Sequence, residues 1–66
     1  MKEYSLIGVD GNAYSLMGYT SQALKRTGHH DLVEKMFSEA TTGDYNHLIR
    51  VCMHYVDIAN GDSKEG

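Results

Sequence analysis

The sequence predicts a mostly α-helical domain of the α+β class, in which three short amphipathic helices follow one N-terminal β-strand. Three segments carry apolar residues at the three-and-four spacing of a helical face, and breaks containing glycine or aspartate separate them. Residues 3–9 differ, because they are rich in β-branched and aromatic side chains and end at an Asp-Gly-Asn turn. This order of patterns is typical of a single strand followed by a small helical bundle.

The length and composition indicate one domain. A chain of 66 residues has room for one core, and residues 61–66 contain no apolar side chain, so we expect a single domain over residues 1–60 and a disordered tail over residues 61–66. Cys52 is the only cysteine, which excludes an internal disulfide and favours the cytoplasm. No apolar run is long enough for a signal peptide or a membrane span.

The charge and the motif content exclude several classes of function. The chain has six basic and nine acidic residues, a formal charge of −3, whereas nucleic-acid binding requires many cations against phosphates. Nucleic-acid binding is therefore the least favoured class. No residues show the spacing of a catalytic or metal site, and so small a core can hardly enclose a cleft. We predict no enzyme and no cofactor.

The first helix is predicted from Ala13 to Thr27. Asp10 or Asn12 can cap its N-terminus, because short polar side chains accept backbone N–H groups at that position. Gly28 supplies a C-terminal stop. The predicted inward face comprises Ala13, Leu16, Met17, Thr20, Ala23, Leu24 and Thr27.

Two more helices are predicted after short breaks. Asp31 can cap a second helix that ends near Ala40, and Thr42 or Asp44 can cap a third that begins near Tyr45. The second helix has the inward face Leu32, Val33, Met36, Phe37 and Ala40. The third has the inward face Tyr45, Leu48, Ile49, Cys52, Tyr55, Val56 and Ala59, with Asn46, His47, Arg50, His54 and Asp57 opposite.

A lone strand over residues 3–9 needs partners for its backbone groups. The alternation of apolar and acidic residues at positions 56–58 allows the third helix to end near Tyr55, with residues 55–59 returning as a second short strand. Alternatively, the strand pairs with its counterpart in a homodimer. The sequence leaves both arrangements open.

Two stretches carry a family resemblance. Residues 8–13 form a G-x-D-G-N-A turn, and residues 40–48 form an A-T-S/T-G-D-Y-N/D-H-L segment. In these features the chain resembles, over nearly its whole length, a family of short uncharacterised proteins from bacteria and their phages. The resemblance implies a phage or prophage accessory protein, and it carries no catalytic residue across.

The candidate metal and nucleophile sites have simpler structural interpretations. His47 and His54 are seven residues apart, whereas side chains that hold one ion on a helix are three or four apart, so we predict no metal site. Cys52 lies on the apolar face of its helix, where a thiol is inert.

The turn Asp10-Gly11-Asn12 is a further candidate, because a helix N-terminus can hold a phosphate. Asp10 would repel an anion, and no lysine follows in the register of a phosphate-binding loop. These two features favour a structural turn.

The best candidate for a binding surface is the polar face of the third helix. There His47, Arg50 and His54 can present donors to an acidic or phosphate-bearing partner, with an ordinary solvated face as the competing interpretation. Tyr14 and Tyr19 flank the inward face of the first helix. Tyrosines suit an interface, and they equally suit the rim of a small core.

These observations predict a binding module and no catalyst. We expect a small phage or prophage accessory protein, cytoplasmic and homo-oligomeric, that binds a host protein and modulates or inhibits it. The alternative is an oligomer that sequesters a nucleotide-like small ligand through His47, Arg50, His54 or the Asp10-Gly11-Asn12 turn.

Overall fold

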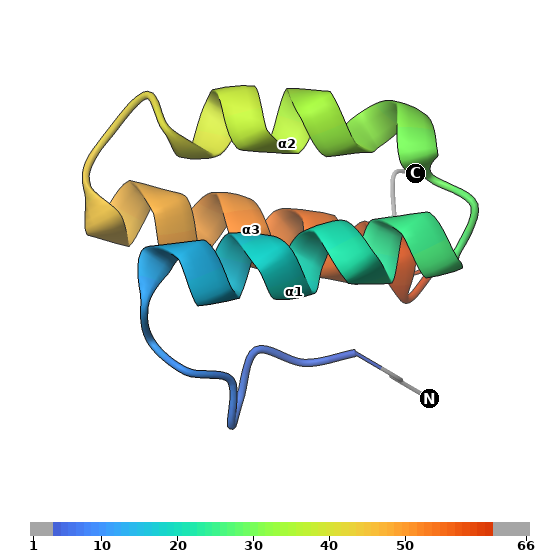
Figure 1. Cartoon of the computed structure of the whole chain (residues 1–66), viewed down its shortest axis with the longest axis horizontal. Helices are drawn as coiled ribbons and strands as arrows, with labels where there is room; N and C mark the ends of the chain where they lie inside the picture. Colours follow the sequence, from blue (N-terminus) through green and yellow to red (C-terminus); the bar gives the residue numbers. More distant parts are fainter. Residues whose placement is uncertain (1–3, 62–66) are drawn as a thin grey trace.

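Three α-helices account for most of residues 4–61, the part of the chain that the computed structural model describes (Figure 1). α1 spans Ala13–Arg26, α2 spans Val33–Ala40 and α3 spans Tyr45–Ala59. A 3-10 turn, η1, spans His30–Leu32 and leads into α2. α1 and α3 run in the same direction, and α2 returns antiparallel to both. The predicted mostly helical fold with three helices is confirmed.

The ends of α1 follow from local side-chain and backbone hydrogen bonds. Asn12 is the N-cap, because its Oδ1 accepts the N–H of Tyr14 at 2.8 Å. At the other end the N–H of Gly28 bonds the carbonyl of Lys25 at 3.3 Å, and the N–H of His29 bonds that of Leu24 at 2.7 Å. These two bonds satisfy carbonyl groups that have no partner within the helix. α1 therefore ends just before Gly28, which was predicted to be its C-terminal stop.

The predicted cap of the second helix is wrong. Asp31 lies inside η1, and the residue before α2, Leu32, makes no side-chain capping bond. The 3-10 turn runs directly into α2, and its His30 carbonyl accepts the N–H of Val33. Because the preceding turn supplies this acceptor, α2 begins without a polar side chain at its head.

The two residues predicted as possible caps of the third helix, Thr42 and Asp44, bond to different helices. Asp44 caps α3, since its Oδ1 accepts the N–H of His47 at 3.0 Å. Thr42 instead closes α2, where its Oγ1 donates to the carbonyl of Glu39 at 2.8 Å.

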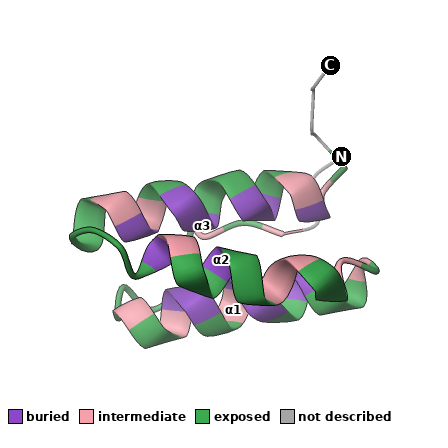
Figure 2. Cartoon of the chain, turned by 90° about the horizontal axis from the view of Figure 1, so that it is seen from above, coloured by how far each residue is buried: buried purple, intermediate pink, exposed green. Residues whose placement is uncertain are grey.

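The core lies where the three helices meet (Figure 2). Most of its residues come from the predicted inward faces, but Phe37 and Tyr45 are exposed, whereas Ser21 and Val51 are buried. The buried face of α3 is wider than one stripe, because α3 packs against both α1 and α2. The core cluster comprises Leu16, Met17, Ala23, Leu24, Met36, Ala40, Leu48, Val51, Cys52, Tyr55 and Ala59.

The predicted N-terminal strand is wrong for the residues that the structure describes. Residues 4–9 are irregular, and position 3 lies outside the described range. A tight turn interrupts the segment, in which the N–H of Val9 donates to the carbonyl of Leu6 at 3.0 Å. Gly8 occupies this turn with a φ of +88°, a conformation that only glycine adopts readily. A turn in the middle of the segment prevents a continuous strand.

The alternative of a second strand over residues 55–59 is also excluded. α3 continues to Ala59, and Tyr55, Val56 and Ala59 are buried on its inward face. The alternation at positions 56–58 is therefore part of a helical pattern. The predicted disordered tail lies outside the described residues except for Gly61.

Candidate functional site

The N-terminal segment, residues 4–12, lies against the face of α1 and α3 opposite α2 (Figure 1). It runs antiparallel to α1 before the chain turns into that helix. Tyr4, Leu6 and Val9 pack against the core from this side. A hollow lies between the segment and α3, and another borders the segment and α1.

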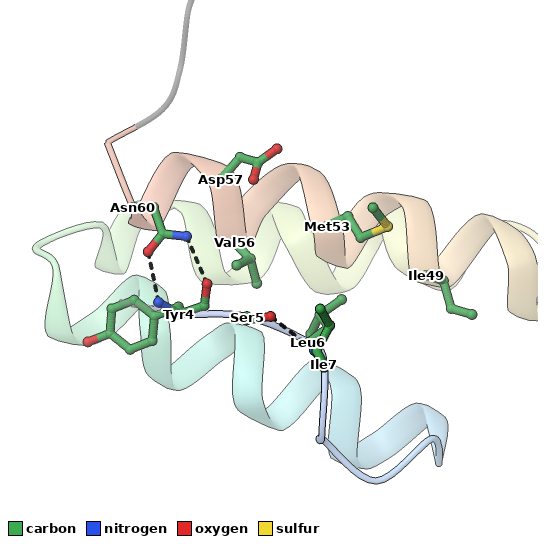
Figure 3. A pocket seen from close by; sticks show the side chains of 9 residues that line it. All are labelled: Tyr4, Ser5, Leu6, Ile7, Ile49, Met53, Val56, Asp57 and Asn60. Carbon is green, nitrogen blue, oxygen red and sulfur yellow. Dashed lines mark hydrogen bonds between the residues drawn. The ribbon is translucent and has the colours of Figure 1, made fainter. Parts of the chain in front are cut away.

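Side chains of the two helices hold the start of the segment. The Asn60 carboxamide bonds Tyr4 twice, because its Oδ1 accepts the Tyr4 N–H and its Nδ2 donates to the Tyr4 carbonyl, each at 2.9 Å (Figure 3). The hydroxyl of Tyr19 accepts the N–H of Ser5 at 2.9 Å. At the start of the segment predicted as a strand, the backbone groups of Tyr4 and the N–H of Ser5 are thus paired by side chains of α1 and of the residue after α3. The unpaired strand edge that suggested a dimer is therefore not present in residues 4–9.

The end of the segment is the turn that we considered as a phosphate site. Its oxygens already accept hydrogen bonds within the chain: Asp10 Oδ1 accepts the N–H of Asn12 at 3.2 Å, and Asn12 caps α1. The carbonyl of Gly11 accepts the hydroxyl of Tyr45 from the start of α3. This turn joins the N-terminal ends of α1 and α3, and its bonds give it a structural role.

The larger hollow, which we call the α3 groove, has an apolar floor and two exposed apolar side chains at its rim. It encloses about 430 Å³ between residues 4–7 and one face of α3 (Figure 3). Leu6, Ile49 and Val56 contribute to its lining. Ile7 is 92% exposed and Met53 is 54% exposed. Water therefore contacts apolar surface on both sides of this groove.

The smaller hollow, which we call the α1 cleft, has aromatic and polar walls. It encloses about 290 Å³, and its lining includes the three α1 residues Gly18, Gln22 and Arg26. The rings of Tyr4 and Tyr19 also line it and meet edge to face, with centroids 6.3 Å apart. Arg26 gives this cleft a cationic group.

Gly18 is unusual within the α1 cleft. A Cβ atom added at this position would meet no atom within 4 Å beyond its own stretch of helix, so packing within the described chain does not require a glycine there. In the interior of a helix glycine costs about 0.5–1 kcal/mol relative to alanine. The residue therefore lowers the stability of α1 and leaves the backbone open to the cleft.

The polar patch predicted on the third helix is divided. His47 is half-buried at the α2–α3 connection, where its Nε2 bonds the carbonyl of Glu39 at 2.8 Å and lies 3.1 Å from Thr42 Oγ1. Arg50 and His54 are exposed, and the His54 ring packs edge to face on Tyr55. His47 thus joins two helices, while the other two remain on the surface. None of the three lines either hollow.

The two predicted tyrosines also separate. Tyr14 is 81% exposed near the start of α1 and lines neither hollow. Tyr19 is half-buried, lines the α1 cleft and holds Ser5. Only Tyr19 lies at a site that could take a ligand.

The groups with shifted pKa values lie in the core and line neither hollow. Burial raises the pKa of the Cys52 thiol, and a hydrogen bond with the Thr20 side chain lowers it by less. Burial also raises the pKa of the Tyr55 hydroxyl, and the Glu39 carboxylate that accepts its hydrogen bond at 3.1 Å raises it further. These protonated groups are suited to packing, as the sequence predicted for Cys52.

Residues 4–61 contain neither a metal-binding cluster nor a helix that could span a membrane. Within this range, no three His, Cys, Asp or Glu side chains are grouped so that they could hold a metal ion. The helices in the same range are too short or too polar to cross a membrane.

Of the predicted site residues, only Tyr19 lines a hollow, so most of the residues that shape the hollows were missed. Ile7 falls in the segment predicted as a strand, and no predicted face includes Met53, Gly18 or Arg26. The glycine inside an otherwise regular helix was the one available signal, because such a residue destabilises a helix without an evident local reason.

Comparisons with family models, curated proteins and solved structures find no match for this chain.

Proposed function

We propose that this chain is a protein-binding module whose α3 groove receives an apolar side chain of a partner protein. The observation that carries the proposal is the exposure of Ile7 and Met53 beside a groove with an apolar floor. Burying an exposed aliphatic side chain contributes about 1.5–3 kcal/mol. A partner that covers both side chains and fills the groove gains a substantial part of a micromolar affinity from them.

The charge of the chain selects the kind of partner. The formal charge of −3 favours a basic protein, and Asp57 contributes a carboxylate to the groove lining. Opposite charge accelerates encounter and disfavours acidic competitors. The occupant we propose is a segment that inserts one or two apolar side chains and carries lysine or arginine next to them.

The biological role we propose follows the family resemblance. A small phage or prophage accessory protein with a preformed binding groove acts by covering a surface of a host protein, and so modulates or inhibits that protein in the cytoplasm. No chemistry is required of the chain for this role. The alternative occupant of the groove is a second copy of the same chain.

The experiment compares groove variants with a matched surface variant. The tagged chain is expressed in its host, the captured protein is identified and purified, and its affinity for each variant is measured by calorimetry. We expect Ile7→Asp and Met53→Asp to weaken binding by about tenfold or more, because each places a charge on a buried apolar contact. Tyr14→Asp is the control, since Tyr14 is also an exposed apolar side chain but lies outside the groove.

Three results would contradict the proposal. Equal affinity of the captured protein for the parent chain and both groove variants shows that it binds elsewhere. Loss of binding in Tyr14→Asp of the same size shows a nonspecific surface effect. If sedimentation equilibrium reveals a dimer that Ile7→Asp and Met53→Asp dissociate, a second copy occupies the groove.

A further inference from the structure

The α1 cleft is a second potential binding site, distinct from the α3 groove in its chemistry. Gly18, Gln22 and Arg26 are spaced by four residues, so they lie one above the other on a single face of α1. The first leaves an open patch of backbone, the second offers an amide, and the third offers a guanidinium. Along two turns of this face, a position without a side chain is followed by a neutral amide and then by a cation.

The walls of the cleft are fixed by the fold. The Tyr19 hydroxyl accepts the N–H of Ser5, and the two hydrogen bonds with Asn60 hold Tyr4. The Tyr19 ring is held through its hydroxyl and Tyr4 is held through its backbone, and the two rings meet edge to face beside the open backbone of Gly18.

The combination of groups defines a class of ligand. A guanidinium pairs best with a carboxylate or phosphate, through parallel N–H bonds. Aromatic walls and a floor without a side chain suit a planar ring. A hollow of about 290 Å³ lies just below the usual range for ligand sites, so only a small ligand would fit.

We propose that the α1 cleft binds a small aromatic anion, with its ring over Gly18 beside Tyr19 and its carboxylate or phosphate on Arg26. In this arrangement an alanine methyl at position 18 would occupy the place of the ring. This site is independent of the proposed protein-binding function, because only Tyr4 lines both hollows.

The test is an amide NMR titration of the full chain with phenylacetate in one arm and phenyl phosphate in the other. We expect saturable shifts at Gly18, Gln22 and Arg26 with at least one probe, and the stronger arm identifies carboxylate or phosphate as the natural headgroup. Benzyl alcohol, which has the ring without the charge, should bind at least about tenfold more weakly.

Two variants separate binding from folding. Gly18→Ala should raise the melting temperature by roughly 4 °C, because alanine favours the helix, yet weaken the better probe by about tenfold or more. Arg26→Gln should weaken it by a similar factor. Lys25→Gln removes the same charge from the neighbouring residue, which does not line the cleft, and should change the affinity by less than about twofold.

The following outcomes would overturn the proposal. No shift at Gly18 with either probe at roughly 10 mM excludes a site of useful affinity. Unchanged affinity in Gly18→Ala removes the role assigned to the open backbone. Equal losses in Lys25→Gln and Arg26→Gln show attraction to general positive charge instead of a built site.

Discussion

Asn60 pairs with both backbone groups of Tyr4, which lies 56 residues earlier in the chain. Its carboxamide accepts the Tyr4 N–H and donates to the Tyr4 carbonyl, as a peptide unit of a neighbouring strand would do (Figure 3). Asn60 is also the C-cap of α3. One side chain thus attaches the start of the N-terminal segment to the end of the last helix, and both hollows depend on that attachment.

Replacing Asn60 should loosen the N-terminal segment and lower stability. Asn60→Ala removes two hydrogen bonds, each of which contributes about 1 kcal/mol net, so we expect the free energy of unfolding to fall by about 1–2 kcal/mol. Asn60→Asp keeps the acceptor but places a carboxylate oxygen against the Tyr4 carbonyl, and should cost at least as much as the alanine variant. Urea unfolding measures both effects.

Hydrogen exchange at the Tyr4 amide provides the local readout. Its protection should fall in Asn60→Ala, whereas Asn46→Ala, at an exposed position of α3, should leave it unchanged. Unaltered Tyr4 protection in Asn60→Ala would show that other contacts hold the segment.

The Tyr55 hydroxyl should make stability depend on pH in the alkaline range. The folded chain raises the pKa of Tyr55, so it holds this proton more tightly than the unfolded chain does. The resulting stabilisation is fully present below the unfolded-state pKa of about 10 and is lost as pH rises through the higher folded-state pKa. Urea unfolding between neutral and alkaline pH follows this loss.

Tyr55→Phe tests the origin of that loss. The variant should be about 1 kcal/mol less stable at neutral pH, because the bond to Glu39 is absent, and its alkaline decline should be shallower. Tyr14→Phe, at an exposed position, should follow the parent chain. A parent-like decline in Tyr55→Phe would assign the pH dependence to another group.

Cys52 should resist thiol reagents in the folded chain. Its side chain is fully buried, and burial raises the pKa of the thiol, so little reactive thiolate is present or accessible. We expect labelling by a disulfide reagent to be at least about a hundredfold slower in buffer than in denaturing urea, because the reagent must wait for opening of the core. Similar rates in the two solvents would show that Cys52 reaches the surface without unfolding.

Gly43 and His47 should behave as an energetically coupled pair. A Cβ atom at position 43 would lie 2.8 Å from the His47 ring, too close for either to stay in place. Gly43→Ala should therefore displace the ring from the Glu39 carbonyl and cost about 1 kcal/mol, as should His47→Ala. In the His47→Ala background the ring contacts are gone but the Cβ of residue 47, 2.9 Å from the added Cβ, remains, so Gly43→Ala should cost less than in the parent chain without becoming neutral.

A double-mutant cycle measures this coupling. Urea unfolding of the parent chain, both single variants and the double variant should give a coupling energy of at least about 0.5 kcal/mol. Additive costs would mean that the ring does not occupy the space beside Gly43.

Much of the fold could be predicted from local patterns. The three helices were predicted because their apolar periods are long enough to dominate, and the ends of α1 followed from Asn12 and Gly28, whose preferences act over a few residues. The N-terminal segment was predicted wrongly, since its residue types favour a strand but Gly8 forms a turn. No local signal identified Asn60 as the partner of Tyr4.

The candidate site depended more on tertiary structure than the helices did. His47, Arg50 and His54 share a polar pattern in sequence, yet packing of α2 against α3 draws His47 to Glu39 and leaves the others exposed. The α3 groove and the α1 cleft exist because the N-terminal segment crosses the face of two helices.

The sequence by itself determined the helices and most of the buried faces and narrowed the caps of α1 and α3 to two residues each, because these features depend on residues within a few positions of each other. Only the tertiary structure decided how the N-terminal segment is held and where the chain is hollow. Those features arise from contacts between residues as distant as Tyr4 and Asn60, and such contacts form only when the helices have packed.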